Sequence, residues 1–138
     1  MEGGTLLKIQ ESAENYLETI LMLGKEKGNV RSIDIATALS FSKPSVSVAM
    51  KNLRENGYIL MDKDGYIALT EKGHEIAETI YERHTLLSSF LMYLGVSRET
   101  ATQDACRIEH VISPESFEAL KQHVYSHKEM MDFNDVKM

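Results

Sequence analysis

The sequence lacks the features of a secreted or membrane-bound protein. Its one cysteine, Cys106, cannot form an internal disulfide, and a reducing compartment would keep the thiol available. The longest apolar runs are only a few residues, and no basic leader precedes an apolar stretch with a small-residue cleavage site. We therefore expect a cytoplasmic protein that is not associated with a membrane.

The chain also lacks internal repeats, low-complexity tracts and a flexible linker. Its 138 residues, 43% of them hydrophobic, are enough to bury a core, so we do not expect a disordered chain. They predict one compact domain, or two small ones that share a continuous helix.

Charge is distributed unevenly along the chain. The formal net charge of -6 argues against a protein that coats nucleic acid by bulk attraction. Residues 31–65, however, hold five basic residues against four acids, and no acid lies between Lys43 and Arg54. A locally basic element on an acidic body indicates a local function.

The first half of the chain has the pattern of three helices followed by a hairpin. Helical spacing of apolar residues predicts helices over 12–28, 32–40 and 44–57, with Ser12 and Ser32 as N-caps and Pro44 in the first turn of the third. The segments 58–62 and 66–70 predict two strands joined by a turn at Asp64 and Gly65. This order predicts a winged helix-turn-helix domain over residues 1–72.

The second half predicts three further helices. They cover residues 70–93, 97–112 and 113–127, with Ser97 and Ser113 as N-caps and Pro114 at a first helical position. We expect a mainly α protein, in which the winged domain is followed by an all-helical domain over residues 73–138. The long helix that begins near Thr70 is the expected bridge.

The helix that begins near Pro44 has the composition of a DNA-recognition helix. In a helix-turn-helix the second helix lies in the major groove, so its exposed face should be small, polar and basic, because phosphates line both rims. We expect lysines and arginines to contact phosphates and serines to lie near base edges. The predicted DNA-binding residues are Arg31, Ser42, Lys43, Ser45, Ser47, Lys51, Arg54 and Lys63.

Two alternatives stay open for this element. It could be an ordinary basic surface helix, or part of a winged helix that binds protein, which the absence of acids over 43–54 opposes only weakly. No set of aromatic residues suited to stacking on single strands is present.

The segment DACRIEHVIS, residues 104–113, suggests a metal site. Cys106, Glu109 and His110 have i, i+3 and i+4 spacing, so on a helix they would share one face. A thiolate, a carboxylate and an imidazole together suit first-row divalent ions better than magnesium or calcium. Further candidates are His84 and, on the first helix, Glu14, Asn15 and Glu18. Ligands from both halves of the chain would let a metal clamp the two halves together. Each residue also has an ordinary structural explanation, because lone Cys, His and Glu residues are common without a metal.

An enzyme is the competing class of function. A metal-dependent hydrolase could use Glu109 as its base, but the usual zinc-hydrolase motif His-Glu-x-x-His is absent. The pair His123 and His127 has i, i+4 spacing without a nearby acid or thiol, and we interpret it as a surface feature.

Several motifs together resemble a known family. The segments ENYLETI, SKPSVS, LTEKGHEIA, YERHTLL and DACRIEHVIS make residues 10–125 similar to the metal-dependent repressors of the diphtheria toxin repressor and manganese transport regulator type. The resemblance implies a winged DNA-binding domain, a helical metal-binding and dimerisation domain, and a homodimer that binds a palindromic double-stranded operator with metal as corepressor, controlling metal uptake genes.

The resemblance also implies ligands. His84, Cys106, Glu109 and His110 fall at ligand positions of the family, and Glu18 falls where the manganese-sensing branch has a carboxylate. Asn15 departs from both branches, since the manganese branch has Asp there and the iron branch has Met.

The ancillary metal site and the metal itself are less well defined. Ser88 and Thr102 replace ancillary-site ligands of the iron branch, so that site is expected to be altered or absent. The SH3-like domain of that branch is not expected, because the chain ends at Met138. The thiolate favours Fe(II) and the oxygen donors favour Mn(II), while Zn(II) would bind at least as tightly in vitro.

Overall fold

The structure is a computed structural model that describes residues 3–127, with side chains from Glu11 onward. It divides into two compact units, Met1–Glu78 and Thr79–Met138, and each is described by itself. The elements are α1 (Gly3–Lys27), α2 (Ser32–Leu39), α3 (Lys43–Glu55), β1 (Ile59–Met61), β2 (Ile67–Leu69), α4 (Glu71–Tyr93), α5 (Arg98–Ile108) and α6 (Pro114–Tyr125). This order of three helices, a two-stranded wing and three further helices confirms the predicted fold class.

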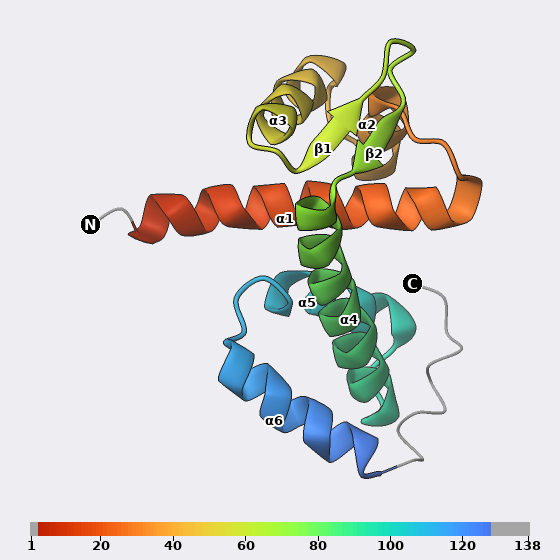
Figure 1. Cartoon of the computed structure of the whole chain (residues 1–138). Coiled ribbons are helices and arrows are strands. Elements are labelled where there is room, and N and C mark those ends of the chain that lie inside the picture. The colour runs from red at the N-terminus through yellow and green to blue at the C-terminus, as the bar shows by residue number, and fades with distance from the viewer. Residues whose placement is uncertain (1–2, 128–138) are drawn as a thin grey trace. The chain divides into compact units, whose positions relative to one another are not determined.

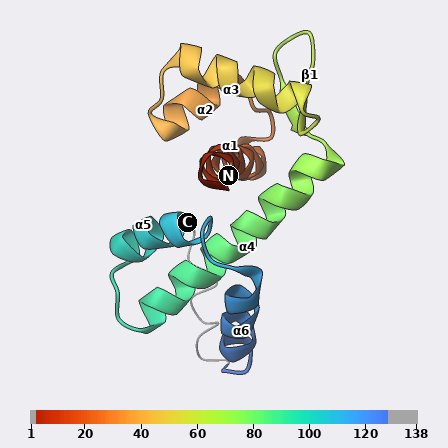
Figure 2. The same ribbon diagram turned by 90° about the vertical axis from the view of Figure 1, so that its left-hand side faces the viewer.

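The first unit is a winged helix-turn-helix. α1 packs against α2 and β2, and α3 packs against α2 and β1. Figures 1 and 2 show α2 and α3 on the same side of α1. Side chains from all five elements are buried and form the core, among them Leu17, Ile35, Val46, Met50, Ile59 and Ile67. Burial of apolar side chains of this size stabilises the unit by about 1.5–3 kcal/mol each, before the entropy of ordering them is counted.

The wing is a short antiparallel hairpin with Ile59 opposite Leu69 and Met61 opposite Ile67. The carboxylate of Asp62 closes the turn by accepting hydrogen bonds from the backbone N–H groups of Asp64 and Tyr66, both at 2.9 Å. Gly65 has a φ of 85°, which glycine adopts without steric cost. The predicted Asp-Gly turn is therefore present, and it holds Lys63 in the exposed tip.

A close backbone approach ties the start of α4 to the loop before β1. The hydroxyl of Thr70 donates to the carbonyl of Gly57 at 2.7 Å and accepts from the N–H of Gly73 at 3.1 Å. A Cβ atom at position 73 would lie 2.1 Å from the carbonyl oxygen of Tyr58. Only glycine fits here, so the first turn of α4 belongs firmly to the winged unit.

The second unit consists of the later part of α4 with α5 and α6, and Figure 2 shows α5 and α6 beside that part of α4. Leu86 of α4 packs with Phe117 and Val124 of α6 in a buried cluster. The side chains of Ser97 and Ser113 accept hydrogen bonds from backbone N–H groups three residues later, which confirms both as N-caps. None of the helices within residues 3–127 has the length and hydrophobicity needed to cross a bilayer.

Three helix boundaries differ from the sequence predictions. α1 begins at Gly3, so Ser12 lies within the helix and is not its cap. The cap of α2 is Arg31 and not Ser32, because the carboxylate of Asp34 accepts a hydrogen bond from the Arg31 N–H at 2.8 Å. α5 ends at Ile108, four residues before the predicted end at 112, and Glu109 is its C-cap.

The early end of α5 has a tertiary cause. The guanidinium of Arg83, on α4, donates to the carbonyl oxygens of Glu109 and Ile112, both at 3.1 Å. In a continuing helix these two carbonyl oxygens would accept hydrogen bonds from backbone N–H groups four residues later. Because Arg83 satisfies them instead, the chain can leave the helix and turn toward Ser113.

Candidate functional site

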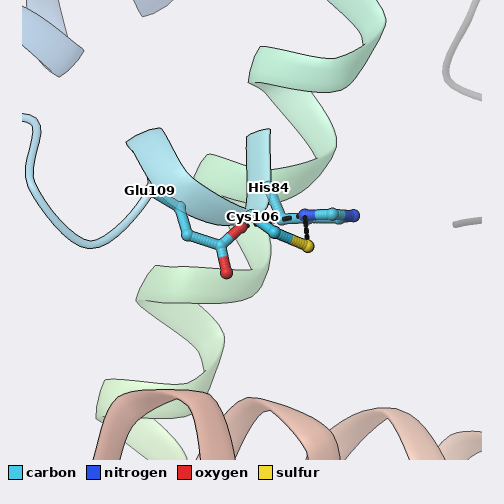
Figure 3. A group of neighbouring side chains, drawn as sticks. All are labelled: His84, Cys106 and Glu109. Atoms are coloured by element: carbon cyan, nitrogen blue, oxygen red, sulfur yellow. Dashed lines mark hydrogen bonds and ion pairs between the residues drawn. The ribbon is translucent and has the colours of Figure 1, made fainter. Parts of the chain in front are cut away.

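Three potential metal ligands converge in the second unit. His84 lies on α4, Cys106 lies in the last turn of α5, and Glu109 is the C-cap of α5. One ligand atom from each lies within 4.8 Å of the others. Figure 3 shows the three side chains gathered together, with dashed lines from one ring nitrogen of His84 to the Glu109 carboxylate and to the Cys106 sulfur.

The contacts within this group are short and mostly buried. Nδ1 of His84 lies 2.8 Å from Oε1 of Glu109 and 3.8 Å from Sγ of Cys106. The relative exposure of His84 is 3% and that of Glu109 is 0%, while Cys106 is exposed. The group therefore has an interior end, which is closed to water, and an outer end, where the thiol is accessible.

Without a metal, a proton holds these groups together. Burial lowers the pKa of His84, but the hydrogen bonds to Cys106 and Glu109, together with the charges of the same two groups, outweigh it and raise the pKa to about 10. The imidazole is therefore protonated at neutral pH and lies against the Glu109 carboxylate as a buried ion pair.

The donor set fits a divalent transition metal. Zinc-type bonds of about 2.0–2.3 Å to nitrogen, oxygen and sulfur place the donor atoms roughly 3–4.5 Å apart around one ion. The donor atoms of these three residues all lie within 4.8 Å of one another, so small shifts would let them share an ion. An imidazole, a carboxylate and a thiolate suit a first-row divalent ion, since calcium and magnesium prefer oxygen alone. The same proton that holds His84 to Glu109 must leave when a metal binds.

His110, another predicted ligand, contacts Glu109. It follows the end of α5, and its Nε2 lies 3.2 Å from Oε2 of Glu109. The carboxylate of Glu109 thus has His84 at one oxygen and His110 at the other. Because α5 ends at Ile108, Glu109 and His110 follow the helix, and the common ligand role of Cys106, Glu109 and His110 stays a prediction.

The two remaining predicted ligands belong to the first unit. Asn15 and Glu18 lie one turn apart on α1, where Asn15 is half-buried and Glu18 is buried. The backbone carbonyl of Asn15 accepts a hydrogen bond from the hydroxyl of Thr19 at 2.8 Å.

Two residues outside the predicted ligand set donate hydrogen bonds to backbone carbonyls of the cluster residues. Arg83 fixes the backbone of Glu109, as described above. Ser88 donates its hydroxyl proton to the backbone carbonyl of His84 at 2.7 Å. Arg83 directly precedes His84 in the motif YERHTLL, but only the fold shows that its side chain reaches the loop after α5.

The two histidines at the end of α6 interact with each other. The rings of His123 and His127 have centroids 4.4 Å apart, and Nδ1 of His127 lies 2.8 Å from the carbonyl oxygen of His123. His123 is exposed and His127 is half-buried.

The predicted DNA-binding residues lie at the surface of the first unit. Ser42 is the N-cap of α3, and its hydroxyl oxygen accepts from the N–H of Ser45 at 3.3 Å. The other face of α3 is apolar and buried through Val46, Met50 and Leu53. The exposed residues of the predicted set on or before α3 are Ser42, Lys43, Ser45, Ser47, Lys51 and Arg54.

Two residues of the set, Arg31 and Arg54, lie against other side chains. The Arg31 guanidinium stacks over the ring of Tyr66 in the wing, 4.4 Å from its centroid. An Nη of Arg54 lies 3.9 Å from the sulfur of Met61. Both arginines therefore lie against the wing, while Lys63 is exposed in its turn.

Comparison with known proteins identifies the class of molecule that has this fold and this site. The family model "Iron dependent repressor, N-terminal DNA binding domain" matches residues 8–67. The model "Iron dependent repressor, metal binding and dimerisation domain" matches residues 70–130. Together they cover both units, and the chain belongs to this family of metal-dependent repressors. The predicted resemblance is confirmed.

Individual relatives agree with this assignment. The chain is 36% identical over 118 residues to the transcriptional regulator MntR of Escherichia coli O6:H1, covering 86% of this chain and 76% of that protein. It is 40% identical over 102 residues to the HTH-type transcriptional regulator MntR of Geobacillus kaustophilus, covering 74% and 72%. The structure of the manganese regulator SloR superposes with a TM-score of 0.73 at 31% identity, covering 82% of this chain.

The chain spans about half of the solved SloR chain, 53% of its length. The relatives and both family models nevertheless make the protein a metal-responsive transcriptional repressor with a divalent metal as cofactor. Its family is one of regulators and not of enzymes.

Proposed function

We propose that this chain acts as a cytoplasmic homodimer that represses metal uptake genes by binding a palindromic operator when Fe(II) or Mn(II) is bound. One observation carries the proposal: His84, Cys106 and Glu109 converge within 4.8 Å inside the unit that matches a metal-binding and dimerisation domain. Two winged units in one dimer would read two half-sites related by the same two-fold axis.

The ion would be held by His84, Cys106 and Glu109. When bound, its positive charge would take the place of the buried proton and would be shared among more donor atoms. Glu109 supplies one oxygen to this group and presents the other to His110, so His110 is a ligand of the same ion or of a neighbouring one. Asn15 and Glu18, one turn apart on α1, complete the proposed ligand set with oxygen donors. Glu18 is buried, as a metal-ligating carboxylate normally is.

The donor set supports both iron and manganese. The Cys106 thiolate favours Fe(II), whereas Glu18, Glu109 and the Asn15 carbonyl favour Mn(II). Since Zn(II) follows both in the Irving-Williams order, affinity measured in a test tube would not by itself identify the physiological ion.

For DNA, we propose that α3 enters the major groove. Lys43, Lys51 and Arg54 would contact phosphates along its rims, with Lys63 and Arg31 at the wing. The serines at the start of α3 would lie near base edges, and the N–H groups of its first turn suit a phosphate.

The proposal is tested by measuring operator binding during titrations with Fe(II), Mn(II) and Zn(II), each buffered at its cellular free level. The probe is the strongest-binding duplex that the metal-loaded full-length protein selects from a random-sequence library. We expect metal to tighten binding by about 5- to 150-fold, which is the usual range of allosteric coupling. Glu109→Ala should remove that response, and the matched exposed variant Glu118→Ala should keep it.

Two results would count against the proposal. If Glu109→Ala still requires metal and binds DNA as the native protein does, the ligand assignment fails. If metal changes neither the affinity for DNA nor its salt dependence, the winged unit binds another partner, such as a protein, and the proposed regulation fails.

A further inference from the structure

An exposed valine interrupts the polar surface of α3. Val48 is 60% exposed, whereas Val46 and Met50 on the opposite face are 0% and 1% exposed. Its side chain therefore contributes little to the core of the winged unit.

The neighbours of Val48 place it at the centre of the surface proposed to face DNA. Residues three or four positions away on a helix lie on the same face. For Val48 these are Pro44, Ser45, Lys51 and Asn52, and all four are exposed. An isolated exposed valine is common on protein surfaces, but this one lies in the middle of a segment, residues 43–54, that contains no acid.

Two serines at the start of α3, Ser42 and Ser45, already have hydrogen-bond partners. The hydroxyl of Ser42 donates to the hydroxyl of Ser45 at 2.9 Å and also caps the helix by accepting from the Ser45 N–H. These hydroxyls stabilise the end of α3, so a role in reading bases would compete with the cap. The branched side chain of Val48 has no such competing interaction to lose.

The major groove presents one apolar group that a valine can recognise. Each base pair displays hydrogen-bond donors and acceptors there, and thymine alone adds a C5-methyl group. Valine can make no hydrogen bond to a base edge, but it can exclude water from that methyl group.

We propose that Val48 reads the C5-methyl group of a thymine in each half-site of the operator. This inference rests on the proposed function, namely that α3 enters the major groove. It adds a residue that determines sequence preference, one that the set of polar and basic DNA-binding residues does not include.

The experiment uses the full-length protein loaded with Mn(II) and the selected duplex described above. Each thymine is replaced in turn by deoxyuridine, which removes only the methyl group, and the dissociation constant is measured. We expect one thymine in each half-site whose replacement weakens binding about fourfold, the effect of returning one methyl-sized group to water. Replacement of both symmetric thymines should weaken binding about sixteenfold, because distant effects add.

The protein variant assigns the effect to Val48. Val48→Ala should bind the thymine and deoxyuridine duplexes about equally. The matched control is Val111→Ala, the same change at a valine that is 67% exposed in the second unit, and it should discriminate as the native protein does.

The outcomes separate this inference from the proposed function. If the native protein selects a duplex but no thymine methyl matters, or if Val48→Ala discriminates as strongly as the native protein, the inference is overturned and the proposed function stands. If the metal-loaded protein selects no duplex, the proposed function fails and this inference fails with it.

Discussion

The polar side chains proposed to bind DNA and those proposed to bind a metal lie in opposite environments. On the surface of α3, residues such as Ser45 and Lys51 are exposed to water. In the second unit, His84 and Glu109 are almost completely removed from water and lie 2.8 Å apart. A buried charged group depends strongly on its partner, while an exposed charge is screened and nearly independent of its neighbours. Substitutions should therefore have large, coupled effects in the metal cluster and small, additive effects on α3.

The largest expected effect is the loss of stability in Glu109→Ala. The substitution leaves His84 buried without its carboxylate partner, and breaking a buried ion pair in this way typically costs about 3–5 kcal/mol. We expect the free energy of unfolding of the metal-free protein to fall by about 3 kcal/mol, measured by denaturant titration. Glu118→Ala, at an exposed glutamate of α6, should change it by less than about 0.5 kcal/mol. Similar losses in the two variants would remove the contrast between buried and exposed sites.

The next effect concerns backbone contact in the winged unit. Gly73→Ala would place a methyl group 2.1 Å from the carbonyl oxygen of Tyr58, so the start of α4 must move. Overpacking of this kind costs about 1–3 kcal/mol. Gly24→Ala is the control, since no atom lies within 4 Å of its added Cβ and alanine favours a helix by about 0.8–1 kcal/mol. Thermal unfolding should show a loss for the first and a gain for the second, and a gain for both would contradict the close approach.

Much of the fold could be predicted because its signals are local. The Asp-Gly turn, the Ser97 and Ser113 caps and the alternation of buried and exposed residues on α3 each depend on a few neighbouring residues. The end of α5 could not be predicted in this way. It is set by Arg83, which lies 26 residues before Glu109 and takes backbone carbonyls that the continuing helix would need.

The same limit applies to the site. The spacing of Cys106 and Glu109 was enough to suggest a metal, because both lie at the end of one helix. Their contact with His84 joins residues 25 apart and depends on how α4 packs against α5, which periodicity does not contain. The end of α5 at Ile108, which leaves His110 outside the helix, was also missed.

A pH titration of metal affinity sharpens the comparison between the buried cluster and the exposed surface of α3, since only the buried cluster should respond to pH. The pKa of His84 rises from its ordinary 6.5 to about 10 in the folded protein. Its proton therefore stabilises the fold below pH 6.5, and that stability is lost as the pH rises through about 10. Because a metal must displace this proton, affinity should rise with pH within the same window, by up to about tenfold per unit for one proton.

Calorimetry of Mn(II) binding between pH 6.5 and 8.5, in buffers of different ionisation enthalpy, would count the released protons. We expect at least one per ion, and the same number in His74→Gln, where the changed histidine is exposed on the winged unit. An affinity that does not change over this interval would show that His84 gives up no proton to the metal.

Metal preference should respond to the one soft ligand. Cys106→Glu exchanges a thiolate at the accessible end of the cluster for a carboxylate, which favours manganese over iron. We expect the ratio of Mn(II) to Fe(II) concentrations needed for half-maximal DNA binding to fall by about tenfold, equivalent to 1.4 kcal/mol. Anaerobic DNA-binding titrations with each metal measure the ratio. If the ranking of the metals does not change, Cys106 is not a ligand.

The smallest expected effect is the loss of a single phosphate contact on α3. Lys51→Ala removes an exposed charge without disturbing the core, so binding at low salt should weaken only a few-fold and uniformly across sequences. The clearer measurement is the slope of log affinity against log salt concentration, which should become shallower by about 0.9 per lost contact, or about 1.8 per dimer. Lys25→Ala, at an exposed lysine of α1, should leave that slope unchanged. An unchanged slope in Lys51→Ala would mean that this lysine faces away from the phosphates, and that α3 lies in the groove in a different orientation.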